Sequence, residues 1–182
     1  MTSRWGMTPR RSVEAECARR GQLRVVSGCV DLLEGRETDD NLVFVLAGPA
    51  ARTVLDGREG RYWFRVWGAR GLLYAWDESA APAVIRATAD DSWRVREMAA
   101  KVIARHGIGD AIDAVAGLRL DAVARVRAAG ERALIVLTDS RASETARQRS
   151  GRSPETSYSM IEAAFGATTV PEGPGAARRD ER

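Results

Sequence analysis

The chain has 182 residues, of which 45% are apolar and 29% are charged. This length suits one domain, and the apolar content is enough to bury a core, which excludes a wholly disordered chain. The longest uncharged apolar runs, such as residues 42–51, stop well short of the roughly 20 residues that a membrane span needs, and the N-terminus lacks the apolar stretch of a secretory signal. We therefore expect a cytoplasmic protein that does not cross a membrane.

The charge balance is mildly basic, with 28 Lys and Arg against 25 Asp and Glu. The basic excess lies in residues 1–30, whereas residues 58–138 are close to balance. Nucleic-acid binders concentrate basic side chains on one surface, and a linear count does not show such a surface. Cys17 and Cys29 lack the spacing of a zinc or redox pair, so they are expected to be reduced, partly buried thiols.

Four short helices are predicted in the first third of the chain. We expect them at 12–20, 22–34, 40–47 and 49–56, because Gly21, Gly35 and the Gly48-Pro49 break interrupt the apolar pattern between them. They are expected to continue the helical stack irregularly and to cap its N-terminal end.

An internal repeat occupies the middle of the chain. Residues 80–106 align with residues 111–137 at an offset of 31, with seven identical positions out of 27. A weaker copy aligns 30 residues upstream, where Trp63 matches Trp93. Each copy divides into two helical stretches that cannot bury their apolar faces alone, so successive pairs are expected to stack and share a core.

The second copy illustrates the pattern. Its first helix is expected over 78–89, with Pro82 in the first turns, where a missing N–H is tolerated. Its second helix begins after Asp91 or Ser92 and stops at Gly107. Apolar residues recur on one face of the second helix at the spacing of an amphipathic helix. They are Val95, Met98, Ala99, Val102, Ile103 and His106.

The string Asp-Asp-Ser-Trp-Arg-Val-Arg over 90–96, followed by Asp-Ala-Val-Ala-Arg-Val-Arg over 121–127, resembles the short HEAT-like repeat of bacterial proteins. The resemblance covers about residues 48–138. It implies an all-α fold, a right-handed α-α superhelix of about four to five helix pairs, in a domain spanning residues 1–138. HEAT arrays carry many roles, so the resemblance predicts a fold and not an activity.

The resemblance also bears on four charged positions. Asp90 recurs as Asp121 and Arg96 recurs as Arg127, at the same offset of 31. In HEAT-like arrays such residues commonly tie one loop to its neighbour by hydrogen bonds, so we interpret them as structural and not catalytic.

The composition changes after about Asp139, where Ser, Thr, Arg, Gly and Pro predominate. Residues 139–182 are therefore predicted to form a mostly flexible tail, with one short helix at 154–165. We expect this helix either to fold back onto the C-terminal end of the stack or to dock elsewhere. If it covers the concave groove of the stack, it would be autoinhibitory.

The sequence contains few of the residues and motifs that enzymes use for catalysis. The chain has one histidine and one lysine, and it lacks a His-pair metal site, a GxxxxGK phosphate loop and a GxSxG elbow. His106 aligns with Leu137, so it is expected to be a packed histidine at the C-terminal end of a helix. We therefore expect no catalytic residue, no metal and no cofactor, although a hydrolase that uses carboxylates alone stays open.

A second apolar face gives the functional prediction. Along 61–76, aromatic residues lie opposite the expected core face, and the repeat carries this stripe into the next helices. Second helices of successive pairs line the concave surface of a solenoid, where aromatic and arginine residues favour binding. The predicted partner-binding residues are Trp63, Trp67, Arg70, Tyr74, Trp93, Glu97, Lys101 and Arg132.

Three interpretations of this stripe stay open. The first is a monomeric, non-enzymatic scaffold whose groove binds a peptide or helix of a partner protein. In the second, the aromatic residues only cover the N-terminal helices. The third is a DNA-binding protein resembling HEAT-like DNA glycosylases, with Asp77 or Asp91 as the carboxylate, against which the near balance of charge in residues 58–138 counts.

Overall fold

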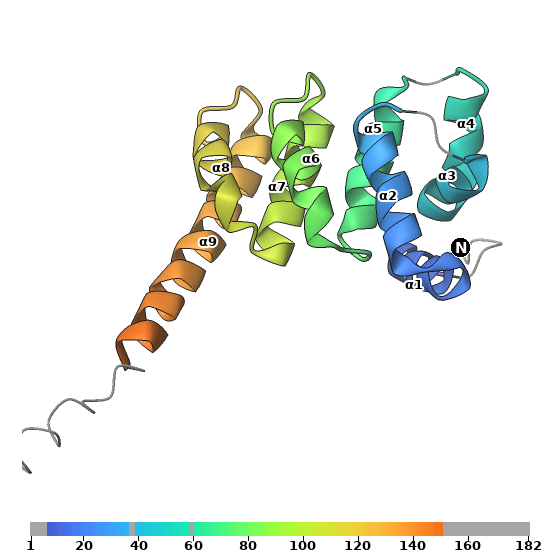
Figure 1. Cartoon of the computed structure of the whole chain (residues 1–182). Coiled ribbons are helices and arrows are strands. Elements are labelled where there is room, and N and C mark those ends of the chain that lie inside the picture. The colour runs from blue at the N-terminus through green and yellow to red at the C-terminus, as the bar shows by residue number, and fades with distance from the viewer. Residues whose placement is uncertain (1–6, 37–38, 59, 151–182) are drawn as a thin grey trace, which may run out of the picture. The chain divides into compact units, whose positions relative to one another are not determined.

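The computed structural model describes residues 7–36, 39–58 and 60–150, and these residues form helices and turns with no strand among them. The all-α prediction is confirmed (Figure 1). The helices are α1 (Pro9–Arg20), α2 (Gln22–Leu33), α3 (Asp40–Ala47), α4 (Ala51–Leu55), α5 (Tyr62–Leu72), α6 (Ala81–Ala87), α7 (Trp93–His106), α8 (Ile112–Leu118) and α9 (Ala124–Ser150). Short 3-10 turns, η1 (Gly48–Ala50), η2 (Glu78–Ala80) and η3 (Gly109–Ala111), precede α4, α6 and α8.

Local sequence signals fix several of these boundaries. The Asp39 carboxylate accepts the N–H of Leu42 at 2.8 Å and so caps the start of α3. Gly107 ends α7 in the left-handed conformation, with φ of 64°, and its N–H bonds the Ile103 carbonyl. Because these signals are local, the predicted helices agree with the observed ones to within a few residues.

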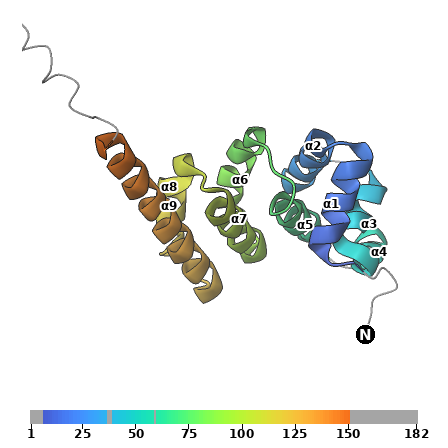
Figure 2. The ribbon, with the colours of Figure 1, turned by 90° about the horizontal axis from the view of Figure 1, so that it is seen from below.

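The helices of residues 7–144 pack mainly as pairs (Figure 2). Helix α6 lies against α7, as the repeat predicts, but the partner of α5 is α2. The repeat resemblance begins at residue 48, yet α4 contacts α3 and η1 instead of forming a pair with α5. A helix from far upstream therefore takes the place that the first helix of a repeat unit occupies elsewhere.

Small residues allow this close pairing. A Cβ on Gly68 would lie 2.5 Å from the carbonyl oxygen of Cys29 in α2, and a Cβ on Gly130 would lie 2.7 Å from the Cβ of Leu118 in α8. Ala99, which stands midway between them at the same offset of 31, is fully buried. One position of each second helix thus carries Gly or Ala, so that the neighbouring backbone can approach.

Two arginine–aspartate pairs join successive units. Arg65 donates from Nε and Nη2 to the Asp90 carboxylate at 2.6 and 3.0 Å, and Arg96 does the same to Asp121 at 2.7 and 3.1 Å. The structural interpretation of Asp90, Asp121 and Arg96 is thereby confirmed. Because Arg65 occupies the place of Arg96, the upstream copy aligns at an offset of 31, and the offset of 30 is wrong.

The C-terminal boundary also differs from the prediction. Helix α9 continues without a break through Asp139 to Ser150, so residues 139–150 are helical, and the helix extends past the predicted end of the domain at residue 138. Ala and Arg recur in this segment, together with Glu144 and Gln148, and these residue types favour a helix. After Gly130, Gly or Pro first appears at Gly151. The expected helix at 154–165 lies outside the described residues.

One continuous core runs through the described helices. It includes Val25 and Leu32 of α2, Leu72 of α5, Ile103 of α7 and Val126 of α9, all almost completely buried. In the part of the chain that the structure describes, no helix is long and apolar enough to cross a bilayer.

Candidate binding surface

The aromatic residues at the start of α5 form a cluster of stacked rings. Trp63 stacks on Tyr62, with ring centroids 5.2 Å apart, and on Trp67, with centroids 6.1 Å apart. Phe64 meets the edge of Trp67 at 5.9 Å. Trp67 is only 4% exposed, whereas Tyr62 and Trp63 are half-buried. The cluster is thus anchored in the core by Trp67 and reaches solvent through Tyr62 and Trp63.

Two arginines extend this cluster to α7 and α9. The Arg94 guanidinium of α7 lies 5.9, 5.4 and 4.4 Å from the ring centroids of Tyr62, Trp63 and Trp93. Arg125 of α9 lies 5.5 Å from the ring of Trp93. Such contacts attract the cation to the face of the ring, by about 0.5–1 kcal/mol at exposed sites. Rings and guanidinium groups therefore alternate from α5 to α9. We call these five residues the aromatic–arginine surface.

A buried carboxylate borders the aromatic–arginine surface. Glu97 of α7 binds Lys101 at 2.9 Å and Arg125 at 3.3 Å. Burial raises the pKa of Glu97, but Lys101 and Arg125 outweigh burial and hold this pKa below its usual range. Glu97 is therefore ionised at neutral pH, and it orients Arg125, whose side chain is 68% exposed.

The structure brings together four of the eight predicted binding residues. Trp63, Trp93, Glu97 and Lys101 lie on or beside the aromatic–arginine surface. The prediction for Trp67 is wrong, because its ring is buried beneath Trp63 and Phe64.

The other three predicted residues do not join this surface. Arg70 lies near the C-terminal end of α5, away from the ring cluster at its start, where it donates to the carbonyl oxygen of Leu46 at the end of α3, and burial lowers its pKa. Tyr74 is 38% exposed and lies beyond the end of α5. Arg132 is exposed on α9 and makes no ring or ion-pair contact with this surface among the described residues. The stripe predicted along α5 thus divides between the two ends of the helix.

Sequence reasoning missed Tyr62, Arg94 and Arg125. The signal was present in the repeat, because Tyr62 and Trp93 occupy one repeat position at an offset of 31, and Arg94 and Arg125 occupy another. Each ring contacts the arginine of the following unit. The misaligned upstream copy, which paired Trp63 with Trp93, concealed this relation.

His106 has a structural environment. Its ring stacks on Trp76 with centroids 4.3 Å apart, and its Nε2 lies 2.8 Å from the carbonyl oxygen of Leu72. Burial lowers its pKa, so the ring is neutral at physiological pH and Nε2 carries the proton that it donates to Leu72. The prediction of a packed histidine at the end of α7 is confirmed.

The remaining reactive groups do not converge on one site. Cys17 and Cys29 are free thiols, and burial raises the pKa of Cys29 to about 12. Such a thiol stays protonated and is a poor nucleophile. Within residues 7–36, 39–58 and 60–150, no group of three or more His, Cys, Asp and Glu side chains is placed to hold a metal ion.

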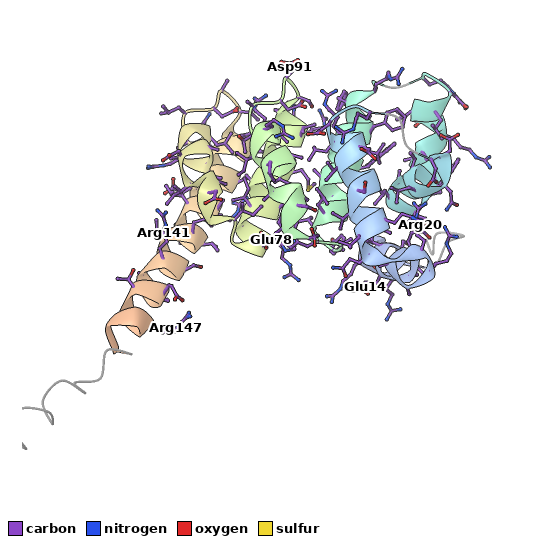
Figure 3. The ribbon with its side chains drawn as sticks, viewed as in Figure 1. Glu14, Arg20, Glu78, Asp91, Arg141 and Arg147 are labelled. Atoms are coloured by element: carbon purple, nitrogen blue, oxygen red, sulfur yellow. The ribbon has the colours of Figure 1, made fainter. Side chains whose placement is uncertain are left out.

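The two carboxylates considered for DNA chemistry lie far apart. Asp91 is in the turn before α7, near Trp93, whereas Asp77 precedes η2, next to Trp76, whose ring covers the other end of α7. Figure 3 labels Asp91 and, next to Asp77, Glu78, and it shows them at opposite ends of the α6–α7 pair. The Asp77 carboxylate accepts from the N–H and hydroxyl of Ser79, which lowers its pKa. Asp77 is therefore a capping residue.

Comparison of the chain with family models, curated proteins and solved structures gave no match in any of the three.

Proposed function

We propose that the chain is a non-enzymatic scaffold of HEAT-like helical repeats that binds a partner protein through the aromatic–arginine surface. The observation that carries this proposal is the run of alternating rings and guanidinium groups across α5, α7 and α9. Its residue types, Trp, Tyr and Arg, are those that dominate binding energy at protein interfaces.

The repeat assignment rests on contacts that recur at an offset of 31. The pair Arg65–Asp90 is repeated as Arg96–Asp121, and the close approach at Gly68 recurs two offsets later at Gly130. A superhelix of HEAT-like units would place α5, α7 and α9 side by side on its concave face. In this arrangement one extended partner could contact the rings and guanidinium groups of all three helices.

The chemistry of the surface favours a peptide or helix that carries both apolar and acidic side chains. The half-buried rings of Tyr62 and Trp93 offer apolar contact, because each leaves part of its face to solvent. Arg125 is exposed and oriented by Glu97, so a partner carboxylate can replace water on its free nitrogens.

The test uses arginine variants, because Trp63 packs against Trp67 and its removal would disturb the core. The full chain is immobilised and exposed to lysate of the source cell, and retained proteins are identified by mass spectrometry. The double variant Arg94→Ala, Arg125→Ala should lose the partner while keeping its helical circular-dichroism signal. The matched control, Arg52→Ala with Arg105→Ala, changes the same charge at exposed sites elsewhere and should retain it. Equal retention by both variants refutes the proposal.

DNA binding of the glycosylase type is the second candidate. Arg94, Arg125, Lys101 and Arg132 are cations on the helices that carry the rings, which favours it. Glu97 neutralises part of this charge, and the rings already engage Arg94, which counts against it. Binding of a labelled duplex that weakens steeply between low and moderate salt supports DNA recognition, and no binding at low salt excludes it.

A further inference from the structure

The last arginine of the repeat, Arg127, binds no aspartate side chain among the described residues. In the two inner units, Arg65 and Arg96 each place Nε and Nη2 on a carboxylate of the following loop. Arg127 occupies the next position at the same offset. Among the residues that the structure describes, its only hydrogen bonds run from Nη1 to the carbonyl oxygens of Asp121 and Ala122, at 2.8 and 3.0 Å.

These backbone contacts hold Arg127 in the position in which Arg96 binds its carboxylate. Arg96 Nη1 donates in the same way to the carbonyl oxygens of Asp90 and Asp91, at 2.7 and 3.1 Å. The guanidinium is planar, so fixing Nη1 also directs Nε and Nη2. Arg127 thus presents the same pair of donors to the side where the next unit would lie.

The chain does not supply that next unit at the expected place. The position 31 residues after Asp121 is Arg152, and α9 continues through residues 142–149, where the next short helix would fall. Up to residue 150, where the described part of the chain ends, no helical pair therefore follows α9 at the offset of 31 residues.

Positions of α9 near Arg127 are exposed, whereas the equivalent positions of α7 are buried. Ala100 and Ile103 of α7 are completely buried, but their counterparts in α9, Glu131 and Leu134, are exposed and half-buried. A shallow hollow of about 670 Å³ lies beside Arg127. It is lined by Ala116, Arg119, Leu120, Ala124, Arg127, Ala128 and Glu131. Arg119 and Glu131 form an ion pair at 2.6 Å, and Leu120 is 90% exposed. We call it the α8–α9 end face.

We propose that the α8–α9 end face binds a helical hairpin of a partner protein whose inter-helix turn presents an aspartate to Arg127. The two internal examples define the ligand. Asp90 and Asp121 each receive two guanidinium nitrogens and also accept the N–H two residues ahead, Ser92 or Val123, at 2.8 Å. The partner's aspartate makes the same contacts, and its helices cover Leu120 and the small residues of the hollow.

A peptide of the chain's own sequence tests this inference. Residues 108–138 contain the turn with Asp121, and a fluorescent peptide of this sequence serves as the probe for the unmodified full chain. We expect saturable binding that weakens at least tenfold when the chain carries Arg127→Met or when the peptide carries Asp121→Asn. The control variant Arg105→Met, at an exposed arginine of α7, should bind the peptide as the unmodified chain does. Equal affinity for the Asp and Asn peptides overturns the proposal.

A second measurement tests the same contact without depending on the folding of a free peptide, because the repeat unit is built into the chain. Residues 108–138 are duplicated after Thr138, so that the added unit carries an aspartate next to Arg127. We expect Arg127→Met to lower the urea midpoint of the lengthened chain and to leave that of the natural chain almost unchanged. The same shift in both chains, or an added unit without helical signal, overturns the proposal. Either result is independent of the aromatic–arginine surface, which lies on other residues.

Discussion

Replacing Asp121 with alanine removes the acceptor that joins two repeat units. The carboxylate receives Arg96 Nε and Nη2 at 2.7 and 3.1 Å and the N–H of Val123 at 2.8 Å. The two side chains are only 17% and 7% exposed, so the variant leaves a largely buried guanidinium without its counter-ion.

The structure sets the size of the expected loss. Breaking a fully buried ion pair from one side costs about 3–5 kcal/mol. Arg96 keeps its bonds to the carbonyl oxygens of Asp90 and Asp91 and retains some water, which reduces the loss. We therefore expect Asp121→Ala to lower the free energy of unfolding by about 3 kcal/mol. Asp90→Ala should cost somewhat less, because Arg65 is more exposed, at 28%.

Urea unfolding followed by circular dichroism measures this loss. A double-mutant cycle with Arg96→Met isolates the interaction energy between Asp121 and Arg96 from the other effects of each substitution. We expect this energy to be well above that of an exposed ion pair, which is about 0.2–1 kcal/mol. Arg96 also lowers the pKa of Asp121, so this stability is fully present above the unfolded pKa of about 3.9 and is lost as the pH falls below that value and through the lower folded pKa. If Asp121→Ala lowers the free energy of unfolding by less than about 1 kcal/mol, with no coupling to Arg96→Met, the Arg96–Asp121 pair is not a stabilising contact.

Two further predictions follow from packing and protonation. Gly68→Ala should destabilise the fold by about 1–3 kcal/mol, because the new Cβ would meet the Cys29 carbonyl oxygen at 2.5 Å, whereas Gly117→Ala meets no atom within 4 Å. Equal urea midpoints for the two variants would refute this. Burial lowers the pKa of His106, so stability should fall as the pH drops through the unfolded value of about 6.5. His106→Gln should flatten the dependence of the urea midpoint on pH between about 5 and 7, and an unchanged slope would place its cause elsewhere.

The predictable part of the fold is the part that short-range patterns determine. Gly107, Pro82 and the apolar face of α7 predict their helices because caps and periodicity act within a few residues. The pairing of α2 with α5 depends on contacts between distant segments, above all the close approach at Gly68. A glycine inside a predicted helix does not reveal in the sequence which backbone lies against it.

The candidate surface was predictable in composition but not in detail. Aromatic enrichment drew attention to α5, and the repeat carried the stripe to Trp93. The sequence does not distinguish Trp67, which fills the core, from Trp63, which caps it, because both lie on the same side of one helix. An offset of 31 for the upstream copy would have paired Tyr62 with Trp93 and predicted the role of Arg94.

Site-specific photo-cross-linking tests the proposed binding surface most directly. A benzophenone amino acid is placed at position 132, which is exposed and lies about two turns after Arg125 along α9, so that the binding residues stay intact, and, as a control, at the exposed position 52 of α4. We expect that irradiation in lysate of the source cell yields a covalent adduct with a partner protein from position 132 and none from position 52. The same adduct from both positions, or none from position 132, would contradict the proposed binding surface.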